Sequence, residues 1–327
     1  MQSRRHFLSS AAVVVGAAAS SQFAFTQGAK FPERPLKIVV PFAAGGGVDV
    51  YALLLANAIT KQAGTTVVID NRAGGNGTIG GNAVKSAASD GYTLLFSAAT
   101  HVMARHVMKS APYDPLQEFA PIARVGEAPM LLVMAPNLTP KTVTELVVAI
   151  KKEPANWTFG TAALGAPGHL ATIAFNEATG TNATILPYRG TAPALNDVAG
   201  GHIQLLIDPV LALLEMAQEK KIVGLAVTSA KRTRLAPDIP TIAEAGFTGF
   251  DHASWYGLWG PNALPRALIT TLNQMFNAAV KQLDSEGQLA RLGIEPVTEA
   301  PQQFADYATQ YVARNAELLK LAKFEPI

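Results

Sequence analysis

The sequence predicts an α/β protein in which helices pack against a mainly parallel β-sheet. Short apolar segments alternate with longer ones whose apolar residues recur at helical spacing, and this alternation is typical of βαβ units. The chain has 327 residues, which is enough for two ordinary α/β domains. Hydrophobic residues make up 49% of it and charged residues only 15%, so a large buried core is available.

The predicted strands are short apolar runs bounded by turn-forming or charged residues. In chain order they cover 36–42 (LKIVVPF), 65–71, 92–99, 130–136, 158–164, 183–189, 203–209, 222–229 and 254–261. The predicted helices cover 48–62, a segment opening within 77–88, 142–152 with Pro140 just ahead of it, 169–179, and three segments between 266 and 322. No low-complexity linker divides the chain, so two domains would be joined by short strands.

The N-terminus has the pattern of an export signal. Paired arginines in SRRHFL precede a short apolar run, Ala11–Ala19, and the motif resembles a twin-arginine signal. The run is shorter than the roughly 20 apolar residues of a membrane-spanning helix. We expect a cleaved signal peptide over residues 1–29, with an uncertain cleavage site, and a mature protein in the periplasm. The alternative is a disordered basic start.

Several functional classes are excluded by composition and motifs. The net charge is only +2 and no lysine/arginine cluster interleaves with aromatic residues, so no nucleic-acid partner is expected. The chain has no cysteine, hence no disulfide, thiolate metal site or cysteine nucleophile. No G-x-S-x-G nucleophile motif occurs, and the carboxylates are scattered rather than paired. We therefore expect binding without turnover: no enzyme, no catalytic residues, no metal and no cofactor.

Two glycine-rich loops follow predicted strands. Residues 75–80 match G-x-G-x-x-G, but the loop does not directly follow its strand, and Asp90 precedes the next strand instead of ending it. Nucleotide binding is therefore disfavoured, and glycines 77, 80 and 81 are interpreted as conformational. The loop at 45–47 lacks the P-loop spacing but opens a helix. Helix N-termini carry unpaired N–H groups and partial positive charge, so this loop is a candidate carboxylate site.

A third loop, TAALGAPGHLA (161–171), again joins an apolar strand to a helix through small residues. His169 falls in the first turn of that helix and is either a ligand contact or a packing residue. A metal role is not expected, because no second ligand lies at a usable spacing.

Seven stretches together resemble the substrate-binding receptors of the tripartite tricarboxylate transporter family, also called Bug-type receptors. They are PERPLKIVVPFAAGGGVDV, VVIDNRAGGNGTIGG, SDGYTLLFSAATH, YDPLQEFAPIA, LPYRGTAPALNDVAGGHIQ, LAVTSAKRTRLAPDIPTIAEAGFTGF and SWYGLWGPNALP. Each stretch alone is weak, but seven in order are specific. The resemblance covers the chain from about Phe31 to its end.

The resemblance implies a type II periplasmic binding protein fold, with a ligand cleft between two α/β lobes. Lobe 1 would comprise 30–130 plus 252–327 and lobe 2 would comprise 131–251. The implied function is capture of a small organic acid and its delivery to a membrane permease of the tripartite tricarboxylate type, by a monomeric receptor. The alternatives are an orphan receptor that presents its ligand to a sensor kinase, and an exported enzyme of unknown chemistry.

The resemblance also implies where the ligand binds. The first loop would contribute Phe42, Ala43, Ala44, Gly45 and Gly46, and the opposing loop Thr161, Leu164, Gly165, Ala166 and His169. Lobe 1 would add Ser97, Ala98 and Thr100, and lobe 2 would add Tyr188, Gly190 and Asp208. Asp49 is either a ligand contact or a helix cap. Ala166 stands where the family usually has Ser or Thr, and Leu53 where it often has Arg, which leaves the identity of the acid open.

Overall fold

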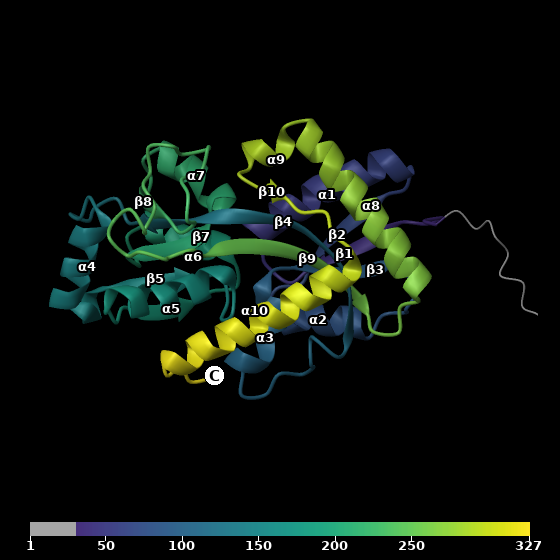
Figure 1. Cartoon of the computed structure of the whole chain (residues 1–327), viewed down its shortest axis with the longest axis horizontal. Coiled ribbons are helices and arrows are strands. Elements are labelled where there is room, and N and C mark those ends of the chain that lie inside the picture. The colour runs from purple at the N-terminus through teal and green to yellow at the C-terminus, as the bar shows by residue number, and fades with distance from the viewer. Residues whose placement is uncertain (1–30) are drawn as a thin grey trace, which may run out of the picture.

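The computed structural model describes residues 31–327, and the expected signal peptide lies outside these residues. In this part of the chain ten strands form one mixed sheet with helices on both faces (Figure 1). The strands are β1 Leu36–Val40, β2 Val67–Asn71, β3 Thr93–Ser97, β4 Phe119–Met134, β5 Thr158–Thr161, β6 Thr184–Pro187, β7 Leu205–Pro209, β8 Val223–Val227, β9 Ala253–Pro261 and β10 Glu295–Pro296. Their order is β2-β1-β3-β9-β4-β7-β5-β6, while β8 and β10 each pair with β4.

The long strand β4 changes its partners halfway. It pairs with β9 from Phe119 to Pro129, and with β7 and β8 from Met130 to Met134. We call β1, β2, β3, β9 and β10, with β4 up to Pro129, the first strand group. The second strand group is β5 to β8 with β4 from Met130.

The α/β class predicted from the sequence is confirmed, but the sheet is less parallel than expected. Parallel pairing joins β1 to β2 and β3, and β5 to β6 and β7. The strands β4 and β9 are antiparallel to each other and to their other partners. The reason is topological: β4 carries the chain into the second strand group and β9 carries it back, so the two strands run in opposite directions.

Helices cover both faces of each strand group. They are α1 Gly47–Ala63, α2 Thr78–Lys85, α3 Ala99–Val107, α4 Val143–Lys152, α5 Pro167–Thr179, α6 Thr191–Ala199, α7 Val210–Gln218, α8 Arg266–Ser285, α9 Gln288–Arg291 and α10 Pro301–Leu321, with 3-10 turns η1 Gly75–Gly77 and η2 Pro154–Asn156. In the first group α1 and α8 share one apolar core, and α3 and α10 share the other. In the second group α4 and α5 cover one face, and α6 and α7 the other.

The sequence explains these layers directly. In β4, Met130, Leu132 and Met134 enter the core beneath α4 and α5, while Leu131 and Val133 enter the opposite core. Successive side chains of a strand point to opposite faces, so a strand covered on both sides is apolar throughout. No helix in residues 31–327 is long and apolar enough to cross a membrane.

Three nine-residue helices, α3, α6 and α7, were not among the predicted elements. Each begins within four residues of the end of a strand, so the short helix is easily read as part of the apolar strand segment. The strand β4 also begins well before the predicted residue 130, because two register shifts accommodate its proline- and glycine-containing first half.

Candidate ligand-binding site

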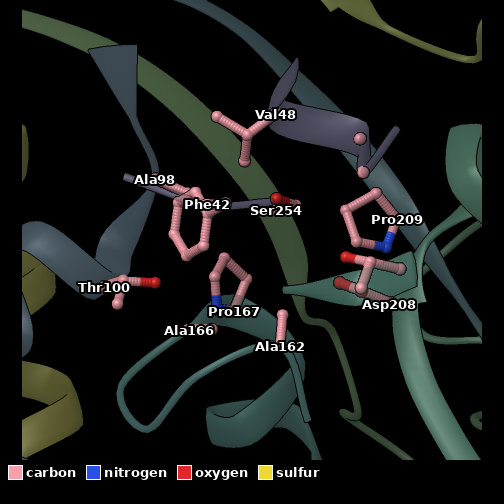
Figure 2. Close-up of a pocket in the computed structure, with 13 residues that line it drawn as sticks. Phe42, Val48, Ala98, Thr100, Ala162, Ala166, Pro167, Asp208, Pro209 and Ser254 are labelled. Atoms are coloured by element: carbon pink, nitrogen blue, oxygen red, sulfur yellow. The ribbon is translucent and has the colours of Figure 1, made fainter. Parts of the chain in front are cut away.

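A small cavity lies where the two strand groups meet, and Figure 2 shows the side chains around it. Its volume is about 20 Å³, room for about one water molecule. The residues that line it are Phe42, Gly46, Gly47, Val48, Ala98, Thr100, Ala162, Ala166, Pro167, Thr191, Asp208, Pro209 and Ser254. None of them is Lys, Arg or His.

The N-terminal ends of five helices surround this cavity. Each contributes its N-cap or first residue to the lining: Gly46 for α1, Ala98 for α3, Ala166 for α5, Thr191 for α6 and Pro209 for α7. None of the five has a side-chain cap; α2, α8 and α9 also lack one, so it is the convergence of the five ends, not the missing caps, that distinguishes the cavity. An uncapped first turn leaves N–H groups unpaired, and a helix N-terminus carries about half a positive charge. The cavity is therefore suited to an anion held by backbone groups.

A side chain from the first turn of α1 holds the first loop by a hydrogen bond on the side away from the cavity. Gly45 has a left-handed φ of +84°, and its N–H donates to Asp49 Oδ2 at 2.9 Å. Asp49 Oδ1 accepts a hydrogen bond of 2.7 Å from the Asn71 side chain. Asp49 thus accepts from the loop and does not line the cavity, and it does not cap α1 by a hydrogen bond.

The opposing loop is braced in the same way by His169. Gly165 has φ +75°, and its N–H donates to His169 Nδ1 at 3.0 Å, so the ring proton lies on Nε2. Burial lowers the pKa of His169 to about 4, so the ring is neutral at neutral pH. The ring packs edge-on against Phe324, with centroids 5.2 Å apart. His169 therefore positions the loop through Nδ1, while its Nε2–H is buried with no hydrogen-bond partner in the described residues.

Glycine is required at position 168, one residue before His169. A Cβ there would lie 2.1 Å from the carbonyl oxygen of Ile207 and 3.6 Å from Asp208 Oδ1. The missing side chain lets the first turn of α5 approach the end of β7 closely. This contact brings Asp208 to the edge of the cavity.

Asp208 is the only ionisable side chain among the cavity-lining residues. Only 5% of it is exposed, and its Oδ2 atom has no hydrogen-bond partner in the described part of the chain. Burial raises the pKa of Asp208 to about 7, against a smaller opposing effect of Thr191. The carboxyl group therefore exchanges its proton near neutral pH.

A further buried polar atom that lines the cavity, Thr100 Oγ1, lacks a partner within residues 31–327. Ser97 Oγ and the hydroxyl of Tyr256, which lies close to the lining residue Gly47, are also unpaired but do not line the cavity. Buried polar atoms are normally hydrogen-bonded, so unpaired ones in this region point to a polar ligand or to ordered water. Figure 2 shows the Thr100 hydroxyl turned towards the cavity.

Two sets of hydrogen bonds join the strand groups beside the cavity. The Asn76 side chain donates to the carbonyl of Leu164 and accepts from its N–H, both at 2.8 Å. The Ala43 N–H donates to the carbonyl of Arg189 at 3.3 Å. Asn76 has φ +53°, so the left-handed turn of the G-x-G-x-x-G stretch presents this side chain to the opposing loop. That stretch therefore joins the two strand groups.

The residues expected at the site fall into three sets. Six line the cavity: Phe42, Gly46, Ala98, Thr100, Ala166 and Asp208. Leu164 and Tyr188 line a neighbouring pocket of about 170 Å³, which also includes Phe42 and Ala162. The others do not line the cavity: Ala43, Ala44, Gly45, Asp49, Ser97, Thr161, Gly165, His169 and Gly190. Leu53 is 46% exposed on α1 and lies away from the site.

Seven lining residues were not named individually from the sequence: Gly47, Val48, Ala162, Pro167, Thr191, Pro209 and Ser254. Gly47, Ala162 and Pro167 lie within the two predicted loops, and the other four were missed. Thr191 and Pro209 follow or end predicted strands and begin short helices, so the rule used for the first loop would have found them. The described residues hold no group of three or more His, Asp or Glu side chains that could bind a metal ion.

Residues 52–323 match the family described as "Tripartite tricarboxylate transporter family receptor". Among curated relatives, Protein BugT of Bordetella pertussis is 33% identical over 292 residues, which cover 89% of this chain and 90% of BugT.

Solved structures of similar proteins cover almost the whole chain. The periplasmic binding protein BugD is 35% identical with a TM-score of 0.86, covering 91% of this chain and 100% of BugD. R. palustris Rpa4515, solved with adipate, is 34% identical with a TM-score of 0.86 and the same coverage. MatC from Rhodopseudomonas palustris, solved with bound malate, is 29% identical with a TM-score of 0.83, covering 88% of this chain and 100% of MatC.

Proposed function

This chain belongs to the tripartite tricarboxylate transporter receptor family, and we propose that it captures a small organic acid between its two lobes in the periplasm. The family consists of solute-binding receptors, not enzymes, and its fold is the two-lobed fold of periplasmic binding proteins. We place lobe 1 at 30–130 plus 252–327 and lobe 2 at 131–251. The change of β4 partners between Pro129 and Met130 supports this boundary.

The convergence of five uncapped helix N-termini on one cavity carries the proposal. Removing a carboxylate from water is costly unless several donors replace its hydration. Here the donors are backbone N–H groups and the hydroxyls of Thr100, Thr191 and Ser254. No basic side chain lines the cavity, so the field of the helix ends would supply the positive potential.

The mechanism that we propose is domain closure. Nearly all residues that line the cavity are buried, so a ligand requires the lobes to separate before it can enter. A ligand that contacts both lobes then shifts the population towards a closed form. The Asn76–Leu164 and Ala43–Arg189 hydrogen bonds would close the entrance beside the ligand.

The ligand class is supported by the relatives. Rpa4515 was solved with adipate and MatC with malate, which are dicarboxylic acids. We propose a dicarboxylate or a related small acid for this chain. Ala166 at the cavity lacks the hydroxyl that the family usually has there, so one polar contact is replaced by an apolar one.

We propose that the protein acts as a monomer and delivers the acid to a membrane permease of the tripartite tricarboxylate type. An orphan receptor that presents its acid to a sensor kinase is the alternative. A deletion strain separates the two: loss of uptake of the bound acid supports transport, whereas intact uptake with lost acid-induced transcription supports signalling. Export by the signal peptide over 1–29 is tested by mass spectrometry of the periplasmic fraction.

A thermal-shift screen of the mature protein tests the binding proposal. The panel contains mono-, di- and tricarboxylates and acidic amino acids, with sugars and nucleotides as controls. A ligand at 100 times its Kd adds about 2.7 kcal/mol of stability, which raises Tm clearly. Shifts confined to carboxylates support the proposal. Shifts with sugars or nucleotides alone, after denaturation and refolding to remove any co-purified compound, contradict it.

A further inference from the structure

We propose that Asp208 selects acids that carry a hydrogen-bond donor, an ammonium or hydroxyl group, beside their carboxylates. The inference rests on the proposed function and narrows its substrate class. Asp208 is the only ionisable residue that lines the cavity, and its Oδ2 atom is buried without a partner. Figure 2 shows its carboxyl oxygens turned into the space between Phe42, Ala162 and Ser254.

No positively charged side chain lines the cavity beside the Asp208 carboxyl group. Thr191 faces it from α6, Gly168 from α5, Pro209 from the start of α7, and Ser254 and Tyr256 from β9. The phenol of Tyr256 is the only other titratable group in this set, and burial raises its pKa, so it stays protonated. No lysine, arginine or histidine lines the cavity. Within the described residues Oδ2 has no donor, so its partner is a proton, a water molecule or a donor group of the ligand that displaces this water.

The two kinds of ligand place different demands on Asp208. A plain dicarboxylate brings only acceptors, so its second carboxylate can approach Asp208 only if one of the two is protonated. A hydroxyl or ammonium group instead donates directly to Oδ2 and supplies the partner that this atom lacks. The helix N-termini hold the ligand carboxylates in either case. Asp208 thus distinguishes acids by the substituent beside the carboxylate.

Three four-carbon acids that differ in one substituent test this inference: succinate, malate and aspartate. We expect the wild type to bind malate or aspartate about 10-fold more tightly than succinate in calorimetry at pH 8, where Asp208 is mostly deprotonated and leaves succinate facing an unpaired buried acceptor. In Asp208→Asn the amide can donate to the ligand carboxylate. Succinate should then bind more tightly, and the preference should fall to within about 3-fold.

Thr100→Val is the matched control, because Thr100 lines the cavity from the first strand group. This variant should weaken all three acids to a similar degree and keep their ratios. The inference is overturned if Asp208→Asn still unfolds cooperatively but has the same ratio of affinities for succinate, malate and aspartate as the wild type. If the wild type binds no acid at all, the proposed function fails instead, which is a different result.

The pH dependence provides a second measurement. The protonated fraction of Asp208 falls as the pH rises through 7. Between pH 6 and pH 8, succinate should therefore bind more weakly and aspartate more tightly, and both trends should disappear in Asp208→Asn. Parallel trends for the two acids in the wild type would contradict the inference.

Discussion

The two loops that face each other across the cavity share one local design. In each, a glycine with positive φ donates its N–H to the side chain four residues later, in the first turn of the following helix. Gly45 donates to Asp49 before α1, and Gly165 donates to His169 before α5. Because the third residue of each helix turns back to brace the loop, the N–H groups of the first turn remain available to the cavity.

The loops differ in the charge of the bracing side chain and in their contact with the opposite lobe. Asp49 is an acid held by two hydrogen bonds, whereas His169 is neutral and binds through Nδ1 alone. The first loop reaches the other strand group through one hydrogen bond of 3.3 Å, and the second through two of 2.8 Å from Asn76. The same backbone arrangement can therefore be set by different side chains, provided that they accept from the glycine N–H.

The largest expected effect comes from filling the cavity at the first loop. Gly46 has an ordinary φ of −82°, and a Cβ there would meet Thr191 and Ala43 at no less than 3.6 Å. Gly46→Leu should fold normally but place its outer carbons in the cavity, weakening acid binding by about 100-fold or more, about 2.7 kcal/mol. Calorimetry measures the affinity.

Gly46→Ala is the matched control and should stay within about 5-fold of the wild type, since its methyl group makes only ordinary contacts. If Gly46→Leu binds the acid with unchanged affinity, the first loop is not part of the site.

An intermediate effect is expected where the second loop meets Asn76. Glycine adopts the left-handed conformation of this residue freely, so Asn76→Gly removes two hydrogen bonds without backbone strain. Each such bond contributes about 1 kcal/mol. If they form only in the closed form, acid affinity should fall by roughly 5- to 30-fold. Calorimetry gives the affinity, and small-angle scattering should show a larger radius of gyration without ligand.

The corresponding control removes the weaker contact of the first loop. Ala43→Pro deletes the N–H that binds Arg189 and should have a smaller effect on affinity. Equal affinities and equal radii for wild type and Asn76→Gly would mean that the second loop is not held more firmly than the first.

The smallest effect on binding is expected at His169, because its ring supports the loop from outside the cavity. Gln can still accept from the Gly165 N–H, so His169→Gln should change the affinity by only a few-fold. A complete loss of binding would make His169 a direct ligand contact and would break the parallel with Asp49.

The pH dependence of the free energy of unfolding tests the protonation state of the His169 ring. The pKa of His169 is about 4 in the folded chain and about 6.5 when unfolded, so between these values the unfolded state binds more protons. The stabilisation that comes from burying His169 in its neutral form is complete above pH 6.5 and is lost as the pH falls towards 4. The free energy of unfolding of the wild type should therefore fall more steeply than that of His169→Gln, by up to about 1.4 kcal/mol per pH unit. Parallel curves would contradict a buried neutral imidazole.

The sequence by itself determined the local units of this protein. Alternating apolar runs predicted the α/β class, and the small residues at 45–47 and 161–168 marked two strand-to-helix loops. Gly46 and Ala166 lie in these loops, because strand ends and helix starts depend on residues close together in the chain, whereas Ala98 was expected only from the family resemblance. The same signals were present at Thr191 and Pro209, where short helices begin within four residues of a strand end.

Only the tertiary structure decided which of these units meet. Asn76 contacts Leu164, 88 residues away, and this changes a weak nucleotide-binding pattern into a contact between strand groups. The isolation of Asp208 likewise depends on α5, α6 and β9 excluding water around it. Periodicity and turn chemistry are local properties of a sequence. Desolvation and the convergence of helix ends depend on neighbours that folding brings from distant parts of the chain.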